Sequence, residues 1–196
     1  MAEISGDSVP GPDGHPRCPW AVSTAGGELY LDYHDTEWGR PLHGDSALFE
    51  RLSLEGFQSG LSWLTILRKR SAFRQAFDGF DPTTVAGYGE DDVARLMSDV
   101  DIVRNLAKIR ATIDNARRVV DLDGGLDDLL WSFAPERSPA PRRVGDVPAV
   151  TPESTAMAKE LRRRGFRFVG PTTAYALMQA TGMVDDHLVD CVARRG

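Results

Sequence analysis

The sequence predicts an all-α fold, and three observations lead to this class. Apolar residues recur at helical spacing in several segments, of which residues 102–122 form the longest. No two alternating runs are joined by a convincing two-residue turn, so a β-hairpin is not indicated. Helix-capping residues stand at the start of several segments. A chain of 196 residues, 41% of them hydrophobic, suits one compact domain or two lobes that share an interface.

The first two helices are predicted from their starts. Asp45 is placed to cap a helix whose apolar positions lie within residues 47–54. Ser62 is placed to cap a second helix with apolar residues on one face between residues 64 and 73. Further on, Asp81-Pro82 indicates a short turn or helix.

The middle of the chain contains three more helical segments, at residues 90–97, 102–122 and 126–133. The stretch 134–150 contains much of the chain's proline and is expected to be a loop. After this loop, Thr151-Pro152 predicts a new helix, because threonine is a good cap and proline fits the first helical position.

The last two predicted helices flank a tight turn that is a candidate DNA contact. The first ends at Gly165, and the second begins after Gly170. The segment is similar to the second half of a helix-hairpin-helix element, in which glycine and the next helix's free amides approach a phosphate. Gly170 and Thr172 are the candidate contacts. An ordinary packing unit of two helices explains the same pattern.

The charge balance limits the class of partner. A formal net charge of −6 argues against a protein that coats nucleic acid non-specifically, but leaves room for DNA binding by one face. Basic clusters occur at residues 68–70 and 162–164. For any single cluster, a solvated helix face is the favoured interpretation.

The N-terminus indicates where the domain begins. Residues 1–16 are rich in Gly, Pro, Asp and Ser, which predicts a disordered leader before a single domain over residues 17–196. No apolar stretch is typical of a signal peptide or a membrane span. A cytoplasmic protein without a membrane partner is therefore expected.

Two cysteines and two histidines form a candidate metal site. Cys18 and His34 lie near one end of the chain, and His187 and Cys191 near the other, four residues apart and on one face if that segment is helical. Two Cys and two His make a closed tetrahedral zinc site of the structural kind. Two core cysteines and two surface histidines remain an equal alternative. His15 and His43 compete less well, because they lie in the leader and in a loop.

An aromatic set surrounds one carboxylate in the N-terminal third. It consists of Trp20, Tyr33, Trp38 and Trp63, with Glu55 beside Gly56 where the first helix pattern ends. Aromatic faces attract positive charge and stack on an extruded cationic purine, whose edge a glutamate can bind. Tryptophans that only fill the core are the alternative.

Four segments together resemble the type I 3-methyladenine-DNA glycosylases. They are residues 33–39 (YHDTEWG), 54–63 (LEGFQSGLSW), 164–170 (RGFRFVG) and 184–191 (VDDHLVDC). The resemblance extends from about residue 17 to residue 191, and several unrelated segments in the same order are more specific than any one of them.

The resemblance implies a helix-hairpin-helix glycosylase fold with a structural zinc ion that joins the two ends of the chain. It assigns the zinc ligands to Cys18, His34, His187 and Cys191. The implied activity is hydrolysis of the N-glycosidic bond of 3-methyladenine in double-stranded alkylated DNA, which releases the base and leaves an abasic site. A monomer is expected.

The resemblance also assigns roles within the site. Glu55 contacts the excised base and is the catalytic candidate. The substrate pocket is implied to be formed by four aromatic residues, namely Tyr33, Trp63, Trp20 and Trp38. Gly60 and Leu61 approach DNA where the base leaves the stack. No lysine nucleophile is needed, and Lys69, Lys108 and Lys159 are expected on polar helix faces.

Three positions depart from the family pattern. Asp101 stands where glycine is usual, and Leu106 where a basic residue is frequent. Asp185 replaces a frequent asparagine, and two roles are open for it: electrostatic support of the sugar cation, or a cap for the segment that carries His187.

Two functions of other classes remain as alternatives to the enzyme. One is a module that binds alkylated bases without excising them. The other is a zinc-stabilised interaction protein with no role on DNA.

Overall fold

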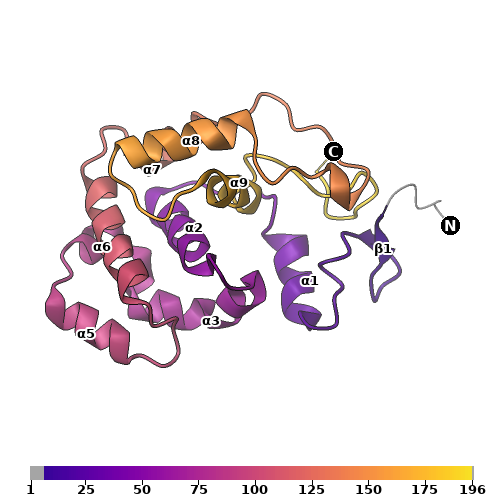
Figure 1. Ribbon diagram of the computed structural model, residues 1–196. Coiled ribbons are helices and arrows are strands. Elements are labelled where there is room, and N and C mark those ends of the chain that lie inside the picture. Colours follow the sequence, from indigo (N-terminus) through magenta and orange to yellow (C-terminus); the bar gives the residue numbers. More distant parts are fainter. Residues whose placement is uncertain (1–6, 196) are drawn as a thin grey trace.

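The computed structural model describes residues 7–195, and within them the fold is mostly helical, as predicted (Figure 1). The helices in chain order are α1 (Gly27–Thr36), α2 (Asp45–Gln58), α3 (Trp63–Ala76), α4 (Pro82–Ala86), α5 (Glu90–Ser98), α6 (Leu106–Val120), α7 (Gly125–Trp131), α8 (Pro152–Arg163) and α9 (Pro171–Ala180). Two 3-10 turns, η1 (Asp78–Phe80) and η2 (Val144–Asp146), and one strand pair, β1 (Val9–Pro10) with β2 (Pro16–Arg17), complete the described elements.

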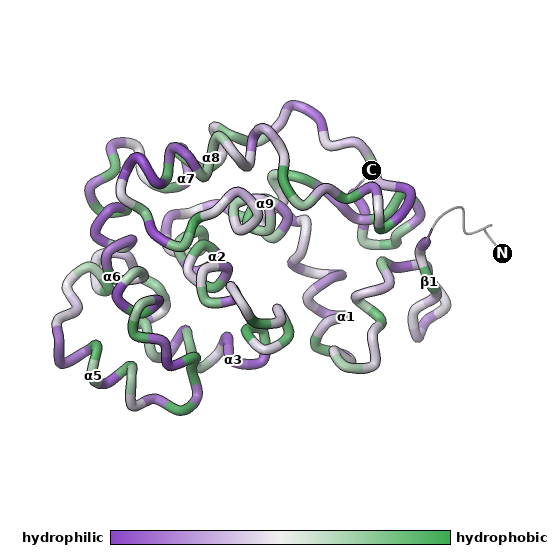
Figure 2. The backbone as a smooth tube through the Cα atoms, in the orientation of Figure 1, coloured by the Kyte–Doolittle hydropathy of each residue, from purple (hydrophilic) through white to green (hydrophobic). Residues whose placement is uncertain are grey.

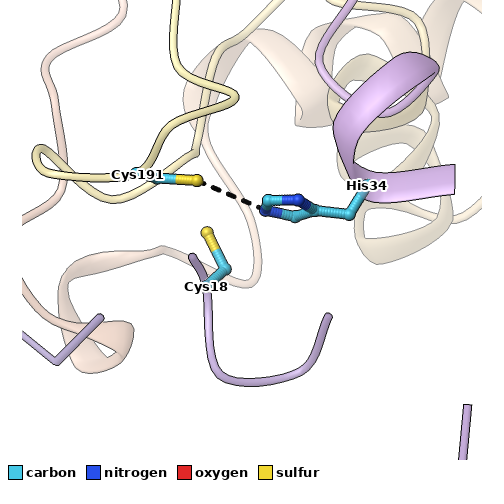
Figure 3. Close-up of side chains that lie close together, drawn as sticks. All are labelled: Cys18, His34 and Cys191. Carbon is cyan, nitrogen blue, oxygen red and sulfur yellow. Dashed lines mark hydrogen bonds between the residues drawn. The ribbon is translucent and has the colours of Figure 1, made fainter. Parts of the chain in front are cut away.

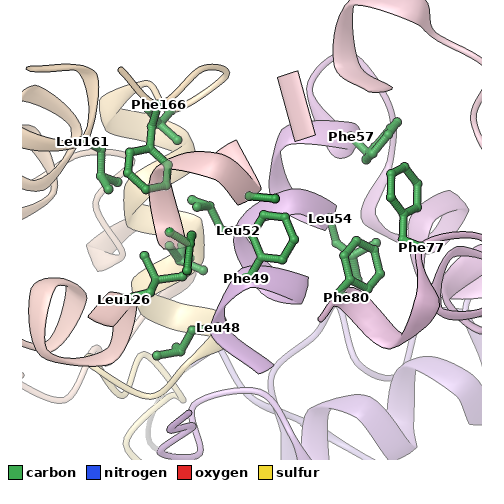
Figure 4. Packing of buried hydrophobic residues seen from close by; sticks show 14 of the residues in the cluster. Leu48, Phe49, Leu52, Leu54, Phe57, Phe77, Phe80, Leu126, Leu161 and Phe166 are labelled. Atoms are coloured by element: carbon green, nitrogen blue, oxygen red, sulfur yellow. The ribbon is translucent and has the colours of Figure 1, made fainter. Parts of the chain in front are cut away.

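Helix α2 runs through the centre of the molecule. Every residue from 48 to 57 is buried, and the helix packs against α3, α6, α7 and α9. Figure 4 shows Phe49 and Leu52 of α2 between Phe80 and Phe166, which come from the first and the second half of the chain. Full burial of a phenylalanine side chain stabilises the fold by about 1.5–3 kcal/mol, so the apolar residues of α2 contribute much of the stability of the core. Figure 2 shows hydrophobic and hydrophilic residues alternating along most of the helices, as expected for elements with one buried face.

Several helix boundaries follow the predicted local signals. Ser62 Oγ accepts a hydrogen bond from Thr65 N at 3.2 Å and begins α3. Thr151 caps α8, whose first residue is proline, in the same way. Gly165 has a φ of +89°, a conformation that few other residues adopt without strain, and ends the helical path there.

Asp45 does not cap its own helix as predicted. Its carboxylate accepts hydrogen bonds from Leu126 N and Asp127 N, both at 2.9 Å, at the start of α7. In return, Asp127 accepts from Gly44 N at 2.6 Å, at the start of α2. The two helices therefore cap each other across about eighty residues of chain, which no local pattern reveals.

Three local predictions differ from the structure. Helix α1, which carries Tyr33 and His34, was not predicted, because it begins after Gly26 and no side chain caps its start. Helix α2 continues through Gly56 to Gln58, so Glu55 lies inside the helix. The segment that carries His187 and Cys191 consists of turns and not of a helix.

The predicted leader differs from the structure in its second half. Residues 9–10 pair antiparallel with residues 16–17, and Val192 N donates to Pro16 O at 2.9 Å, so this part packs against the C-terminal segment. Residues 1–6 lie outside the described residues. Among the residues that are described, none of the helices combines the length and the apolar character that a bilayer crossing requires.

Candidate active site

A cavity of about 360 Å³ lies between α1, the end of α2, the start of α3 and α9. This volume falls in the range of small-molecule sites, which is about 300–1,000 Å³. Its lining includes every member of the predicted aromatic set: Trp20, Tyr33, Trp38, Trp63 and Glu55. The structure thus brings together side chains from α1, α2 and α3 and from the segments that precede and follow α1.

The aromatic rings form a connected wall. Trp20 and Trp38 meet edge to face with centroids 5.2 Å apart, and Tyr33 and Trp63 lie 5.4 Å apart at a tilt of 44°. Tyr30, which was not among the predicted residues, meets Trp20 at 5.4 Å and also lines the cavity. Such a wall presents π-faces and edges to a planar, positively charged guest.

Glu55 is the acidic group of this pocket that has an unused oxygen. Glu55 is only 4% exposed, and its Oε2 has no hydrogen-bond partner. Burial raises the pKa of Glu55 to about 8, and the guanidinium of Arg51 opposes the rise. A buried carboxyl with an empty acceptor is suited to bind a cationic or hydrogen-bonding ligand.

A charged network lies behind Tyr33. Glu37 accepts hydrogen bonds from Arg70 at 2.6 and 2.7 Å and from Arg51, whose guanidinium carbon is 5.5 Å from the Tyr33 ring centroid. These bonds hold the pKa of Glu37 down to about 2 against the opposing effect of burial. The network was not predicted, since its members are far apart in sequence.

Asp186 is a second carboxylate of the cavity wall and was also not predicted. Its Oδ2 accepts from Tyr175 Oη at 2.6 Å and from Gln179 Nε2 at 2.8 Å. The preceding residue, Asp185, points elsewhere: its Oδ1 lies 2.7 Å from His187 Nδ1 and accepts from His187 N at 3.2 Å. The second role considered for Asp185, a local cap, therefore fits this geometry, although a turn follows it and not a helix.

Three of the four predicted metal ligands lie together. The ligand atoms of Cys18, His34 and Cys191 are all within 4.8 Å of one another, and all three residues are buried. Figure 3 shows the Cys191 thiol directed towards the His34 ring, with Sγ 3.4 Å from Nε2, and the Cys18 thiol beside them. No disulfide joins the two thiols. The hydrogen bonds of Cys18 and His34 lower the pKa of Cys191, so this sulfur is the readier of the two to be a thiolate.

His187 lies beside this cluster and outside it. Its ring centroid is 4.7 Å from that of His34, and its Nε2 is 3.3 Å from the carbonyl oxygen of His34. Gly39 makes room for the ring, because a Cβ at that residue would lie 2.8 Å from Cε1 of His187. His43, the lesser candidate, pairs with Asp127 on the surface.

The candidate DNA contacts occupy two exposed turns. Gly60, with a φ of +83°, and Leu61, 41% exposed, form the turn after α2. Gly170 and the exposed Thr172 lie at the start of α9, where the first amides of a helix have no partner within it. The structure does not place either pair inside the cavity.

One lysine lies where the sequence did not predict it. Lys108 is 8% exposed and donates to Phe57 O and Ser59 O, so the expected polar helix face is wrong for this residue. Lys159 is exposed, as expected. No lysine lines the cavity among the residues described, so none is in place to act as a nucleophile there.

Comparisons with known proteins agree on one family. Residues 20–195 match the family model described as methyladenine glycosylase. The DNA-3-methyladenine glycosylase of Haemophilus influenzae is 42% identical over 89% of this chain and 96% of its own. A crystal structure of a 3-methyladenine DNA glycosylase I superposes with a TM-score of 0.86, at 41% identity and over 91% and 100% of the two chains. A variant of such an enzyme in complex with 3-methyladenine gives 0.82, at 35% identity over 86% and 93%.

Proposed function

Since this chain belongs to the methyladenine glycosylase family, we propose that it hydrolyses the N-glycosidic bond of 3-methyladenine in alkylated DNA. The observation that carries this proposal is the unpartnered Oε2 of Glu55 inside a wall of aromatic rings. That arrangement selects a flat, cationic base and leaves an acceptor free for its edge.

The chemistry follows from the charge of the lesion. A methyl group on N3 makes the adenine cationic, so the bond between N9 and C1′ of the sugar breaks with its electron pair moving to the base. Water then adds to C1′ and loses a proton, which leaves an abasic site and a free neutral base. No acid is needed to activate the leaving group. The pocket accelerates the step by binding the departing base more tightly than the stacked one.

Glu55 changes charge in this scheme. Its pKa of about 8 keeps the carboxyl largely protonated in the empty pocket at neutral pH. A cationic base favours the ionised form, so binding and loss of this proton are coupled. Burial then serves discrimination, because a neutral base offers no positive charge to offset the cost of ionising the buried carboxyl.

A structural zinc ion fits the Cys18, His34 and Cys191 cluster, with His187 as the adjacent fourth donor. Two thiols and two imidazoles are a donor set that zinc prefers. The Nδ1 atoms of His34 and His187 each lie 2.7 Å from a carboxylate, of Asp35 and Asp185, which leaves Nε2 as the metal-binding atom in both rings. Bound zinc would join the first and last segments of the domain beside the aromatic wall.

The DNA approaches from the two exposed turns under this proposal. The helix α8, the turn over residues 164–170 and α9 act as a helix-hairpin-helix element, with Gly170 and Thr172 at the phosphate backbone. Arg162 and Arg167 line the same groove as Gly170 and supply positive charge on an acidic protein. Gly60 and Leu61 contact the duplex where the base leaves it. A monomer acting on double-stranded DNA is the simplest arrangement.

Base release tests the proposed function directly. The protein is incubated with methylated duplex DNA, and freed bases are separated by chromatography. We expect release of 3-methyladenine by the wild type and its loss in Glu55→Ala, with circular dichroism showing that the variant is folded. If folded wild-type protein binds methylated DNA and releases no base, the chain is a binding module and not an enzyme.

A further inference from the structure

Two turns of this protein each expose an apolar side chain and each contain a residue with a positive φ. Leu61 follows Gly60, whose φ is +83°, and Phe168 itself has a φ of +56°. Leu61 and Phe168 are each 41% exposed. A bulky residue held in the left-handed region and exposed to water is a sign of function, since folding alone favours neither feature.

These two turns are neighbours although about one hundred residues separate them. A Cβ on Gly56 of α2 would lie 3.5 Å from the Cβ of Phe168, so the hairpin packs directly on the end of that helix. Leu61 N donates to Gln58 O at 2.6 Å, which places the first turn immediately beyond the same helix end. Leu61 and Phe168 therefore belong to one edge of the molecule.

Lys108 of α6 holds the first turn. Its ammonium donates to Phe57 O at 2.8 Å and to Ser59 O at 2.6 Å, which are carbonyls at the C-terminal end of α2. The last carbonyls of a helix lack partners within it and form the negative end of its dipole. Burial lowers the pKa of Lys108, so keeping this cation in place has a cost that its two hydrogen bonds offset.

Asn115 of α6 holds the second turn. Its Oδ1 accepts from Arg167 N at 2.8 Å, and its Nδ2 donates to Arg167 O at 3.1 Å, so both backbone groups of the residue before Phe168 are bound. Asn115 is only 4% exposed. It lies seven residues after Lys108, which is two helical turns, so both side chains leave the same face of α6.

The contact between α6 and the two turns is tightly packed. Lys108, Asn115, Gly56 and Phe168 line a common space of only about 10 Å³, too small for a ligand. The buried polar groups on this face therefore hold the backbone of the two turns in place and do not bind a ligand. A rigid support of this kind is what a DNA-facing turn requires if it is to enter a duplex.

From these contacts we propose that Lys108 and Asn115 are positioning residues that hold two turns as one DNA-facing unit, with Phe168 as a second apolar contact to the duplex beside Leu61. The proposal rests on the function proposed above and deepens it. The unit lowers the cost of extruding the damaged base from a paired duplex. It plays no part in the pocket that receives the base.

The test separates extrusion from the chemistry that follows it. Single-turnover release of 3-methyladenine is measured for Lys108→Met and Asn115→Ala on methylated duplex DNA and on the same DNA as single strands. Binding of free 3-methyladenine is followed by tryptophan fluorescence. We expect duplex release to fall about 10- to 100-fold, as for misplaced positioning groups. Release from single strands and binding of the free base stay near wild type.

Lys69→Met is the matched control. Lys69 also donates to two backbone carbonyls, of Val100 and Asp101, but outside this contact, so its loss leaves the duplex rate unchanged. Phe168→Ala weakens duplex binding alone. The proposal is overturned if Lys108→Met keeps the wild-type duplex rate, or if duplex, single-strand and free-base measurements fall together. A wild type that releases no base on either substrate refutes the proposed function instead.

Discussion

Arg51 lies one helical turn before Glu55 on α2, yet it gives its hydrogen bond to Glu37 and leaves Oε2 of Glu55 without a partner. The usual pairing of oppositely charged residues four apart on a helix is thus avoided. Arg51 still lowers the pKa of Glu55 through space, but burial is the larger effect. Nη2 of Arg51 is bound to Glu37, while Nη1 of Arg51 and Oε2 of Glu55 both stay buried without a hydrogen-bond partner.

Replacing Glu55 by glutamine is expected to stabilise the free protein at pH 8. In the unfolded chain the carboxyl ionises near its usual pKa of about 4.5, while in the folded protein it does so at about 8. The folded state therefore holds the extra proton between these values, and stability falls as pH rises through that window. Across this pH window the free energy of unfolding of the wild type falls by on the order of 3–5 kcal/mol, and that of Glu55→Gln does not. Urea unfolding at pH 5 and pH 8 gives the free energy of unfolding at each pH. An equal change in this free energy for the wild type and the variant would contradict the expectation.

Binding of a cationic base should release a proton from Glu55. Below pH 8 the empty pocket holds the protonated carboxyl. A methylated adenine that is still bonded to its sugar carries a fixed positive charge and favours the ionised form. Affinity should rise with pH up to about 8 and then level off. Calorimetry in buffers of different ionisation enthalpy counts the released proton. Glu55→Gln is the control, and an equal proton release from this variant would show that another group is responsible.

Removal of zinc is expected to destabilise the domain without changing its helical class. The ligand atoms of Cys18, His34 and Cys191 lie within 4.8 Å of one another and join segments from opposite ends of the chain. Losing such a link should lower Tm by on the order of 10 °C, since each kcal/mol shifts Tm by about 2–4 °C at this size. Metal analysis, and melting with and without a chelator, check this. Purified protein that contains no metal and melts unchanged with added zinc would exclude the site.

The two adjacent aspartates should differ in their effect on excision. Asp186 lines the cavity, where its charge favours a sugar cation, while Asp185 is bound to His187. We expect Asp186→Asn to slow single-turnover release about tenfold or more, as for loss of one electrostatic group. Asp185→Asn should mainly weaken retention of zinc. The opposite order, with excision lost only in metal-loaded Asp185→Asn, would restore the catalytic role considered for that residue.

The N-terminal segment is expected to support the wall of the pocket. Asp7 Oδ2 accepts from Val144 N at 3.0 Å, and Val144 and Val147 line the cavity. Loss of one such hydrogen bond costs about 1 kcal/mol. Asp7→Ala should therefore weaken binding of free 3-methyladenine about fivefold at most. A fluorescence titration measures it, with Asp121→Ala on the far end of α6 as the control. An unchanged affinity would show that the loop keeps its place without this contact.

The sequence by itself determined those features whose physical cause is local. The caps at Ser62 and Thr151 act on amides three residues away, so the helix starts could be read from the chain. The aromatic set around Glu55 was also predicted, because most of its members lie in the segments that resemble the family. The family and its activity class follow from the same patterns.

The tertiary structure decided whatever depends on groups that meet across the chain. Asp45 caps a helix about eighty residues away, and Lys108 is buried against carbonyls about fifty residues away. Glu37 binds two arginines from other helices, and one of them, Arg51, directs its Nη2 to Glu37 and makes no hydrogen bond to Glu55. Each of these contacts requires the chain to close a long loop, and its free energy comes from burial and packing that no short window of residues contains.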